Sequence, residues 1–402
     1  MGDFSAAGAV AGGSAVLCRY GEIFLKGANR GFFEKKLVDN IRRAVRPFGA
    51  KVERLHGRVM VVPADIDEAT LRRILAALQH VFGLASVSPV RLVEKKLEAI
   101  TAAAVAETGA ALQQGRPRSF KVETRRADKR FQPASPEVSR LLGGAIIEAY
   151  GLPVDVHHPE LTVGVEVGFE HAFVFARALP GPGGLPVGCT GDVDLLLSGG
   201  IDSPVAGWMA MKRGCRIAAT YFHSHPYTGD KTKDKVAGLA RKLAAWQGRI
   251  ELRVVPFTEA QKALRDSGDG RLAVVLYLRM MMRVAERIAR ERGGKALVTG
   301  EALAQVASQT LENLAVIGSV VTLPILRPLI AHDKLDTIAV AQRIGTYELS
   351  IAPYEDCCSL FLPEHPATKA HPKEVEAAEA RVDMAALIEG CVRGVETIIC
   401  SA

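Results

Sequence analysis

The feature that most constrains the fold is an apolar run that ends in two glycines, in the stretch "VDLLLSGGIDSPVAGWMAMKRGC" at residues 193–215. The run has the length of a buried strand, and Pro204 suits the first turn of a following helix. The alternation continues, with predicted strands at 193–197, 216–222, 250–257 and 296–299 and predicted helices at 203–213, 231–246 and 271–292. Apolar strands between amphipathic helices are typical of a parallel sheet covered on both faces. The back half is therefore predicted to be a doubly wound α/β domain, with its ligand at the carboxyl ends of the strands.

The segment between the first strand and helix of this domain has the chemistry of a phosphate site. Gly199 and Gly200 let backbone N–H groups converge without side chains in the way. Ser198 and Ser203 add hydroxyl groups, and the helix amino end adds positive potential. The segment is not a Walker A loop, because no lysine follows the glycines, and the nearest dinucleotide fingerprint, at 181–186, lacks its third glycine. The sequence therefore predicts a phosphate cradle of another kind.

The composition indicates an ordinary globular protein, since hydrophobic residues make up 48% and charged residues 24% of the 402 residues. No apolar run reaches the roughly 18 residues that a membrane span needs. Residues 1–15 are rich in small residues and lack the positive charges of a signal peptide, so we expect a flexible tail and a cytoplasmic location. The seven cysteines have irregular spacing, which predicts free thiols rather than a disulfide framework or a metal site.

The positive charge is concentrated in the front half of the chain. Residues 1–180 hold 25 Lys and Arg against 19 Asp and Glu, a net charge of +6, whereas residues 181–402 have a net charge of +1. The segment 116–131 alone carries seven basic residues against two acids, and its alternation predicts a strand with the basic row on one side. A polyanion is therefore expected to bind the front half.

A second basic segment, "RYGEIFLKGANRGFFEKKL" at 19–37, mixes Lys and Arg with Phe24, Phe32 and Phe33. Phosphates would meet the cations, because these carry the opposite charge. We expect most of the three aromatic side chains to be core residues rather than stacking surfaces for bases. The front half therefore has two candidate contact regions for a polyanion.

The chain divides into three predicted domains: 16–72, 73–178 and 191–402, with the turn-rich segment 179–190 as the linker before the last one. The first two are predicted mixtures of strands at 15–21, 51–55, 58–64, 119–126, 161–167 and 171–179 with helices at 30–46, 67–83, 93–115 and 135–151. The front half is therefore predicted to be α+β, in contrast to the regular alternation of the back half.

Several segments resemble a known family. The loop "LLLSGGIDSPVAG" resembles the PP-loop of ATP pyrophosphatases, which split ATP between the α and β phosphates. Further segments resemble the tRNA 4-thiouridine synthetases, or tRNA sulfurtransferases, in order and across nearly the whole chain; they are "VTGEALAQVASQTLENL", "PILRPLI", "YEDCCSLFLPEHPATK", "VFGLASVSPV" and "FKVETRRADKRF". The resemblance implies an N-terminal ferredoxin-like domain, a tRNA-binding THUMP domain and a PP-loop domain of the adenine nucleotide alpha hydrolase-like class. It also implies ATP-dependent transfer of sulfur to a tRNA uridine, which gives 4-thiouridine at position 8 through an adenylated intermediate and releases AMP and pyrophosphate.

The resemblance implies an ATP site in which Mg²⁺ accompanies the pyrophosphate. Asp202 is implied to assist Mg–pyrophosphate and adenylation, and Tyr221 and Phe222 to contact adenine. The sequence has Leu278 and Arg279 where the family often has two arginines, which leaves open which of them faces the nucleotide. The implied nucleotide-contacting residues are Leu196, Leu197, Ser198, Gly199, Gly200, Asp202, Ser203, Tyr221, Phe222, Leu278, Arg279, Gly300 and Gln309.

The family resemblance also implies a persulfide on a cysteine late in the chain. The candidates are Cys357 and Cys358, and the spacing to the following Pro-x-x-Lys favours Cys358. Polar and turn residues around the pair argue for exposure. Cys215 is a weaker candidate for the partner that would close a disulfide after the sulfur leaves. We expect the remaining cysteines to be small buried apolar groups, namely Cys18, Cys189, Cys391 and Cys400.

The basic segments and the resemblance together give candidate tRNA-binding residues: Lys26, Arg30, Lys121, Arg125, Arg126, Lys129 and Arg130. Besides tRNA, the expected partner is a cysteine desulfurase or another persulfide donor, and no membrane contact is expected. Only about 30 residues follow Lys369, so the chain resembles the short form without a C-terminal rhodanese-like domain. A secondary sulfur transfer to a sulfur-carrier protein for thiamine thiazole synthesis, which the family ties to that domain, stays open, as does a homodimer.

Two alternative functions also stay open at the level of the sequence. One is another PP-loop tRNA-modifying ligase, amide-forming or lysidine-forming, which would need no cysteine. The other is a non-catalytic tRNA-binding protein with a relic loop, in which Asp202 would matter only for tRNA affinity.

Overall fold

The computed structural model describes residues 14–64, 67–268, 270–353 and 365–401. The chain forms two compact units, Met1–Gly183 and Gly184–Ala402, and the division between them falls inside the predicted linker at 179–190. Within the described ranges, no helix combines the length and the apolar character that crossing a bilayer requires.

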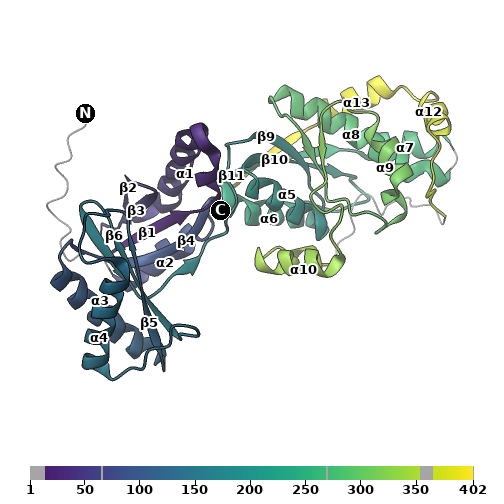
Figure 1. Ribbon diagram of the computed structural model, residues 1–402. Helices are drawn as coiled ribbons and strands as arrows, with labels where there is room; N and C mark the ends of the chain where they lie inside the picture. Colours follow the sequence, from purple (N-terminus) through teal and green to yellow (C-terminus); the bar gives the residue numbers. More distant parts are fainter. Residues whose placement is uncertain (1–13, 65–66, 269, 354–364, 402) are drawn as a thin grey trace, which may run out of the picture. The chain divides into compact units, whose positions relative to one another are not determined.

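The first unit is built on one continuous sheet of order β2-β3-β1-β4-β7-β6-β5, with β8 paired to β4 beside this path (Figure 1). Its strands are β1 (Ser14–Tyr20), β2 (Lys51–Leu55), β3 (Arg58–Val62), β4 (Leu84–Glu94), β5 (Phe120–Arg126), β6 (Leu161–Val167), β7 (His171–Phe175) and β8 (Leu179–Pro180). β4 pairs antiparallel with β1 along its first part and with β7 at its end. The segments expected to form a ferredoxin-like domain and a THUMP domain therefore share a single sheet.

One face of this sheet is covered by α1 (Arg30–Val45), α2 (Glu68–Leu78), α3 (Leu97–Gly115) and α4 (Ser135–Tyr150), and the turn η2 (Glu22–Asn29) precedes α1. Directly opposed residues of an antiparallel pair point to the same face. Cys18 and Val87 are opposed and lie in one core cluster, whereas Val93 and Ala172 are opposed and lie in the next. Because Val87 and Val93 are an even number of residues apart on β4, both cores lie on the same side of the sheet.

The first unit differs from the sequence prediction in several details, besides the earlier ends of α2 and β7. β4 is absent from the prediction, because Pro89 inside it argues against an interior strand. The helix predicted from residue 93 begins at Leu97, since β4 still includes Glu94. The predicted domain boundary after residue 72 falls inside α2, whose Ile74 and Leu78 pack in the core beneath β1.

The second unit has a six-stranded sheet of order β13-β12-β9-β10-β11-β14. Its strands are β9 (Gly191–Leu196), β10 (Cys215–His223), β11 (Arg249–Pro256), β12 (Leu297–Val298), β13 (Ile325–Leu326) and β14 (Glu396–Ser401). The pairs from β13 to β11 are parallel, as predicted, whereas β14 runs antiparallel to β11 at the edge. This edge strand was not predicted, because its position depends on pairing with a segment more than a hundred residues away.

Helices cover both faces of the second sheet (Figure 1). They are α5 (Asp202–Lys212), α6 (Asp230–Gln247), α7 (Thr258–Arg265), α8 (Ala273–Glu291), α9 (Leu311–Gly318), α10 (Lys334–Arg343), α11 (Tyr347–Ser350), α12 (Pro372–Glu379) and α13 (Met384–Arg393). α5 packs with α6 and α10, while α8 packs with α7, α9, α12 and α13. The doubly wound α/β prediction is confirmed, and it places the carboxyl ends of β9, β10 and β12 at one edge of the sheet.

Candidate active site

The predicted phosphate cradle is the short turn between β9, which ends at Leu196, and α5, which begins at Asp202. The Ser198 N–H donates to Ser203 Oγ at 2.9 Å, and the Gly200 N–H donates to Ser198 Oγ at 3.2 Å. The two serine hydroxyl oxygens lie 3.1 Å apart. Local hydrogen bonds therefore preform this turn at a helix amino end, where unpaired backbone N–H groups attract anions.

A cavity of about 220 Å³ opens beside this turn, at the carboxyl ends of β9, β10 and β12. All the predicted nucleotide-contacting residues line it except Gly199 and Arg279. Residues that no sequence pattern indicated complete the lining; they are Thr220, Met281, Met282, Thr299 and Glu301. Four separate segments of the chain thus converge at the edge of the sheet where the fold places its ligand.

Gly300 allows the loop after β12 to pack closely against the amino end of α5. A Cβ atom at this position would lie 2.6 Å from the Ser203 nitrogen and 2.8 Å from the Asp202 carbonyl carbon. Because protein interiors are close-packed, any larger residue would push these two walls of the cavity apart.

The Asp202 carboxylate is held by two side chains from distant segments. Lys334 Nζ lies 2.7 Å and 2.9 Å from its two oxygens, and Gln305 Nε2 donates to Oδ2 at 3.0 Å. Lys334 is the first residue of α10, where the positive end of the helix dipole disfavours a cation. The ion pair with Asp202 offsets this unfavourable interaction. Neither residue was predicted, because Gln305 and Lys334 are 103 and 132 residues from Asp202 in the sequence.

Ala304, just before Gln305, has a left-handed backbone with φ of +61°. This conformation is unfavourable for a residue with a Cβ atom. The Ala304 N–H donates to the Gln309 carbonyl at 2.8 Å, and the Leu303 N–H donates to the Ile330 carbonyl at 3.1 Å. The loop thus holds a strained residue in place, and the strain occurs beside the side chain that contacts Asp202.

Two polar side chains of the cavity differ in how their oxygens are satisfied. A Glu301 oxygen accepts hydrogen bonds from Thr299 Oγ1 at 2.8 Å and from Arg327 Nε at 2.6 Å. Gln309 Oε1 is buried and has no hydrogen-bond partner within the described part of the chain. A buried acceptor without a partner costs roughly 1–3 kcal/mol. Its place on the cavity wall therefore suits a ligand that donates a hydrogen bond, such as an amino group.

Of the two residues between which the sequence left the choice open, Leu278 lines this cavity and Arg279 does not. The Arg279 guanidinium donates twice to Glu379 at 2.8 Å and once to the Val316 carbonyl at 2.7 Å, and its side chain is 3% exposed. Burial alone would raise the pKa of Glu379, but hydrogen bonds from Arg279 and Arg283 lower it to about 2. Arg279 is therefore a buried structural cation.

The predicted RNA-contacting cations near the front of the chain lie against aromatic rings. Lys26 Nζ lies 5.3 Å from the centre of the Phe33 ring, and the Arg30 guanidinium lies 4.4 Å from the centre of the Phe24 ring. Phe24 is 42% exposed and Phe32 is 53% exposed, so the prediction of core positions is wrong for these two. Phe33 packs against the core, as predicted.

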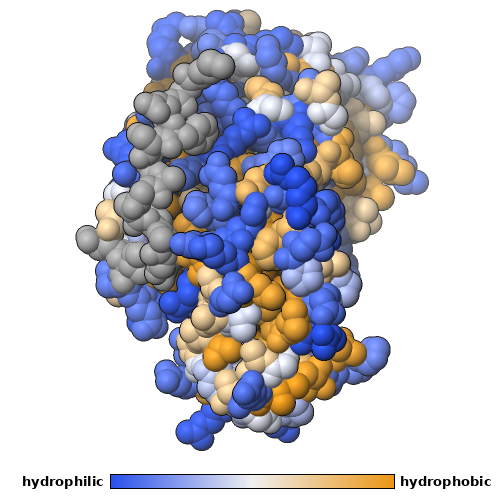
Figure 2. Space-filling view, turned by 60° about the vertical axis from the view of Figure 1, so that its left-hand side comes forward, coloured by the Kyte–Doolittle hydropathy of each residue, from blue (hydrophilic) through white to orange (hydrophobic). Residues whose placement is uncertain are grey.

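The basic residues around β5 do not form one uniform row. β5 places Arg125 and Arg126 on opposite faces, and Arg126 donates to backbone oxygens of the loop 131–133. Arg125 and Arg130 form ion pairs with acids of the same segment. The exposed members are Arg125, Lys129 and Arg130, whereas Lys121 and Arg126 are half-buried. The surface in Figure 2 likewise mixes hydrophilic and hydrophobic side chains over the face that it shows.

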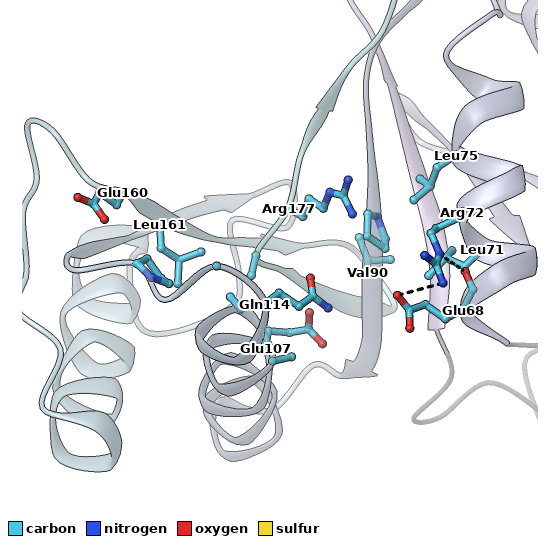
Figure 3. A pocket seen from close by; sticks show the side chains of 16 residues that line it. Glu68, Leu71, Arg72, Leu75, Val90, Glu107, Gln114, Glu160, Leu161 and Arg177 are labelled. Atoms are coloured by element: carbon cyan, nitrogen blue, oxygen red, sulfur yellow. Dashed lines mark hydrogen bonds and ion pairs between the residues drawn. The ribbon is translucent and has the colours of Figure 1, made fainter.

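A larger cavity, of about 610 Å³, lies in the first unit between α2 and α3 (Figure 3). Its charged lining consists of Glu68, Arg72, Glu107, Glu160 and Arg177. Each of the three glutamates forms an ion pair with an arginine. Acids outnumber bases and are already paired, so this cavity does not have the chemistry of a phosphate site.

The predicted persulfide residues Cys357 and Cys358 lie outside the described residues. Cys215 is buried at the amino end of β10, whereas the cavity begins five residues further along the strand, roughly 16 Å away. That separation argues against Cys215 as the disulfide partner at the site.

Burial raises the pKa of the Cys18 and Cys391 thiols to about 12 and about 11. Cys18, Cys391 and Cys400 are buried, as predicted, while Cys189 is partly buried.

Three family models match the chain. They are the ThiI ferredoxin-like domain over residues 15–88, the THUMP domain over 94–177, and the thiamine biosynthesis protein (ThiI) over 188–384. The boundary between the first two matches falls within β4 and not at residue 72.

Relatives are similar over nearly the whole chain. A "Probable tRNA sulfurtransferase" from Moorella thermoacetica is 48% identical and covers 96% of this chain and 97% of the relative. Another from Caldanaerobacter subterraneus is 46% identical and covers 93% of this chain and 97% of the relative.

Two solved structures are also similar. The crystal structure of a 4-thiouridine synthetase–RNA complex with bound ATP is 38% identical, with a TM-score of 0.89, and the match covers 96% of this chain and 100% of that chain. The crystal structure of PH1313 from Pyrococcus horikoshii is 25% identical, with a TM-score of 0.65, and the match covers 83% of this chain and 99% of that chain. The agreement in sequence, domain order and fold shows that this chain belongs to the tRNA sulfurtransferase family.

Proposed function

We propose that this protein transfers sulfur from a protein persulfide to a uridine of tRNA, giving 4-thiouridine at position 8 at the expense of ATP. The observation that carries the proposal is the convergence, on one cavity wall, of the preformed phosphate turn and an Asp202 carboxylate held by Lys334. Membership of the tRNA sulfurtransferase family supports the class of reaction, and the RNA and ATP of the 38% identical structure support the choice of substrates.

The cavity offers complementary groups for each part of ATP. The phosphates would lie on the turn between Ser198 and Ser203, where backbone N–H groups and the amino end of α5 favour negative charge. The adenine ring would lie near Tyr221 and Phe222, with its amino group donating to the unpartnered Gln309 Oε1. Lys334, which is ion-paired with Asp202, would add a positive charge beside the pyrophosphate end.

Asp202 fits a role with Mg²⁺, because this ion is commonly bound by one or two carboxylates together with substrate phosphates. When bound, Mg²⁺ would neutralise charge that builds up on the departing pyrophosphate. Lys334 and Gln305 keep the Asp202 carboxylate in one orientation, so that it does not have to be ordered when substrate arrives.

The chemistry proceeds in two displacements. The uracil O4 attacks the α-phosphorus of ATP, the bond from that phosphorus to the pyrophosphate oxygen breaks, and the uracil is adenylated. The terminal sulfur of a persulfide on Cys357 or Cys358 then attacks C4 and AMP departs with O4, which leaves a C4–S–S–Cys bond. A further thiol, from the protein or an added reductant, attacks the cysteine sulfur of this bond, forms a new disulfide with it and releases 4-thiouridine. Alternatively, that thiol first attacks the cysteine sulfur of the persulfide, forms the same disulfide and releases sulfide, which then attacks C4. Adenylation is needed because the free carbonyl oxygen is a poor leaving group. A cysteine desulfurase or another persulfide donor would restore the persulfide.

A single incubation tests this function. The protein is mixed with unmodified tRNA, ATP–Mg²⁺, a cysteine desulfurase and labelled cysteine, and AMP, label in RNA and the near-ultraviolet absorbance of a thiolated base are measured. We expect all three signals, and the absence of both AMP and label would overturn the proposal. AMP formation without label in RNA, unchanged in a Cys357→Ser/Cys358→Ser double variant, would instead favour a ligase without sulfur chemistry. An effect of Asp202→Ala on tRNA affinity alone would favour a non-catalytic tRNA-binding protein.

A further inference from the structure

The loop that follows β10 presents exposed rings close to the cavity. His225, Pro226 and Tyr227 are exposed, and half of the Tyr227 side chain is open to solvent. We call these three residues the ring platform. Large aromatic side chains are normally placed where they bury surface, so an exposed one on an ordered loop is a candidate contact for a partner.

The loop on both sides of the ring platform is anchored by buried polar contacts. The Ser224 N–H donates to Thr228 Oγ1 at 3.1 Å, and the Thr228 N–H donates to the Ser224 carbonyl at 3.0 Å. Ser224 Oγ is hydrogen-bonded to Gln261 at 2.7 Å, and Thr258 Oγ1 donates to the His225 carbonyl at 2.6 Å. Ser224 and Gln261 are fully buried. The exposed rings are therefore held by a fixed backbone, which lowers the entropy cost of using them for binding.

A series of rings connects the ring platform to the cavity. Tyr221, which lines the cavity, lies 5.8 Å from the His223 ring, and His223 lies 6.1 Å from the His225 ring, measured between ring centres. His225, the first residue of the ring platform, is therefore two ring contacts away from the cavity wall. The ring platform thus stands near the cavity that would hold ATP, where a strand that brings its uridine to the ATP α-phosphorus would pass.

Cations and acids both occur beside the ring platform. Lys262 Nζ lies 5.7 Å from the centre of the Tyr227 ring and 3.2 Å from Glu259. Lys231, at the start of α6, is exposed next to Asp230. A lysine over one face of Tyr227 and a second lysine nearby suit an RNA strand, which brings both bases and phosphates.

We propose that the ring platform binds an unstacked nucleotide of the RNA substrate next to the reacting uridine, with Tyr227 as its stacking surface. This inference rests on the proposed function. A base inside a folded RNA must leave its stack before an enzyme can act on it, so its neighbours lose a stacking partner. An aromatic side chain at that place replaces the lost stacking without reading the sequence.

Steady-state kinetics with separate titrations of tRNA, ATP and the persulfide donor test the ring platform. Loss of one stacking contact in Tyr227→Ala should raise the KM for tRNA roughly tenfold. The KM values for ATP and for the donor should stay within about twofold of wild type, and Tyr227→Trp should keep the wild-type KM for tRNA. Ile399→Ala is the matched control, because Ile399 is similarly exposed, at 55%, on the far edge strand β14.

Fluorescence of the Tyr227→Trp variant gives a test that needs no chemistry. The wild-type protein, with Trp208 and Trp246 packed against each other, provides the baseline. Unmodified tRNA should quench the added emission, whereas ATP alone should not. If wild-type protein thiolates no tRNA, the proposed function fails, while the quenching by tRNA still tests the ring platform.

The ring platform proposal would be overturned by a Tyr227→Ala variant with an unchanged KM for tRNA. It would also be overturned if that variant shifted only the KM for the persulfide donor, which would make the surface a protein contact. A Tyr227→Trp variant whose emission does not respond to tRNA would contradict it as well.

Discussion

The cavity between α2 and α3 and the cavity beside the turn between β9 and α5 differ in their polar groups as well as in their size. The cavity of the first unit has about 610 Å³ and three glutamates that are already ion-paired. This cavity of the second unit has about 220 Å³, yet it combines a preformed turn at a helix amino end, a carboxylate held by Lys334 and a Gln309 oxygen without a partner in the described part of the chain. Convergent polar groups that face a ligand, rather than volume, therefore distinguish the candidate site.

The largest expected effect separates the two cavities. Asp202→Asn should lower formation of AMP and thiolated tRNA on the order of 10³-fold. The reason is that it removes the negative charge that Lys334 and Gln305 hold at the cavity wall. Arg177→Gln, in the larger cavity, should leave the KM for ATP within about twofold. Equal losses of ATP use in both variants, measured by AMP release, would break the comparison between the cavities.

The next effect concerns the side chains that hold Asp202. Lys334→Gln should lower kcat/KM on the order of 10²-fold, since the lysine contributes charge as well as orientation, and Gln305→Leu should lower it about tenfold. Thermal unfolding should change little in either variant, because both side chains lie at the surface of the site. A Gln305→Leu variant with a larger loss than Lys334→Gln would show that orientation dominates over charge.

Arg279 and Leu278 sharpen the distinction between structural and ligand-facing groups. Arg279→Ala should lower the free energy of unfolding by roughly 3–5 kcal/mol, because it leaves the buried Glu379 with one arginine fewer. Leu278→Ala should raise the KM for ATP, while Arg279→Ala should not. Urea unfolding and ATP titration of both variants check this, and a selective ATP defect in Arg279→Ala would restore it as a nucleotide contact.

Asp194 in β9 gives a pH-dependent prediction. The carboxyl is fully buried, and although its hydrogen bond with Thr220 at 2.6 Å opposes the change, burial raises its pKa from 3.8 to about 6. The folded state therefore holds the proton more tightly, and stability should fall as the pH rises from about 4 to about 6. Asp194→Asn should remove this dependence and gain about 1–2 kcal/mol at pH 7. Thermal unfolding of both proteins across this range provides the measurement, and parallel curves would contradict the assignment.

The smallest expected effect lies in the loop beside Asp202. Ala304→Gly should stabilise the protein by up to about 1 kcal/mol, because glycine adopts the positive φ of this position without the penalty of a Cβ atom. Denaturant midpoints of the variant and wild type measure the change. A loss of stability would mean that packing of the Ala304 methyl group outweighs the backbone strain.

Much of the second unit could be predicted from the sequence because its signals are local. The helix predicted at 231–246 differs from the observed helix α6 by one residue at each end. The prediction is this close because amphipathic spacing and flanking turn residues mark both ends of the helix. β4 and β14 could not be predicted, because Pro89 weakens the strand signal in the first and the second depends on pairing with β11. The exposure of Phe24 was also missed, since sequence does not reveal that Arg30 covers one face of its ring.

The sequence by itself determined the turn between β9 and α5, because the residues that tie it together, Ser198 and Ser203, are only five positions apart. It also determined the alternation of strands and helices, which follows from local periodicity. Only the tertiary structure decided that Lys334 and Gln305 meet Asp202, that Leu278 rather than Arg279 lines the cavity, and that Cys215 lies at the amino end of β10, away from the cavity. Backbone conformation is encoded within a few residues, whereas the meeting of distant side chains depends on how whole elements pack against one another.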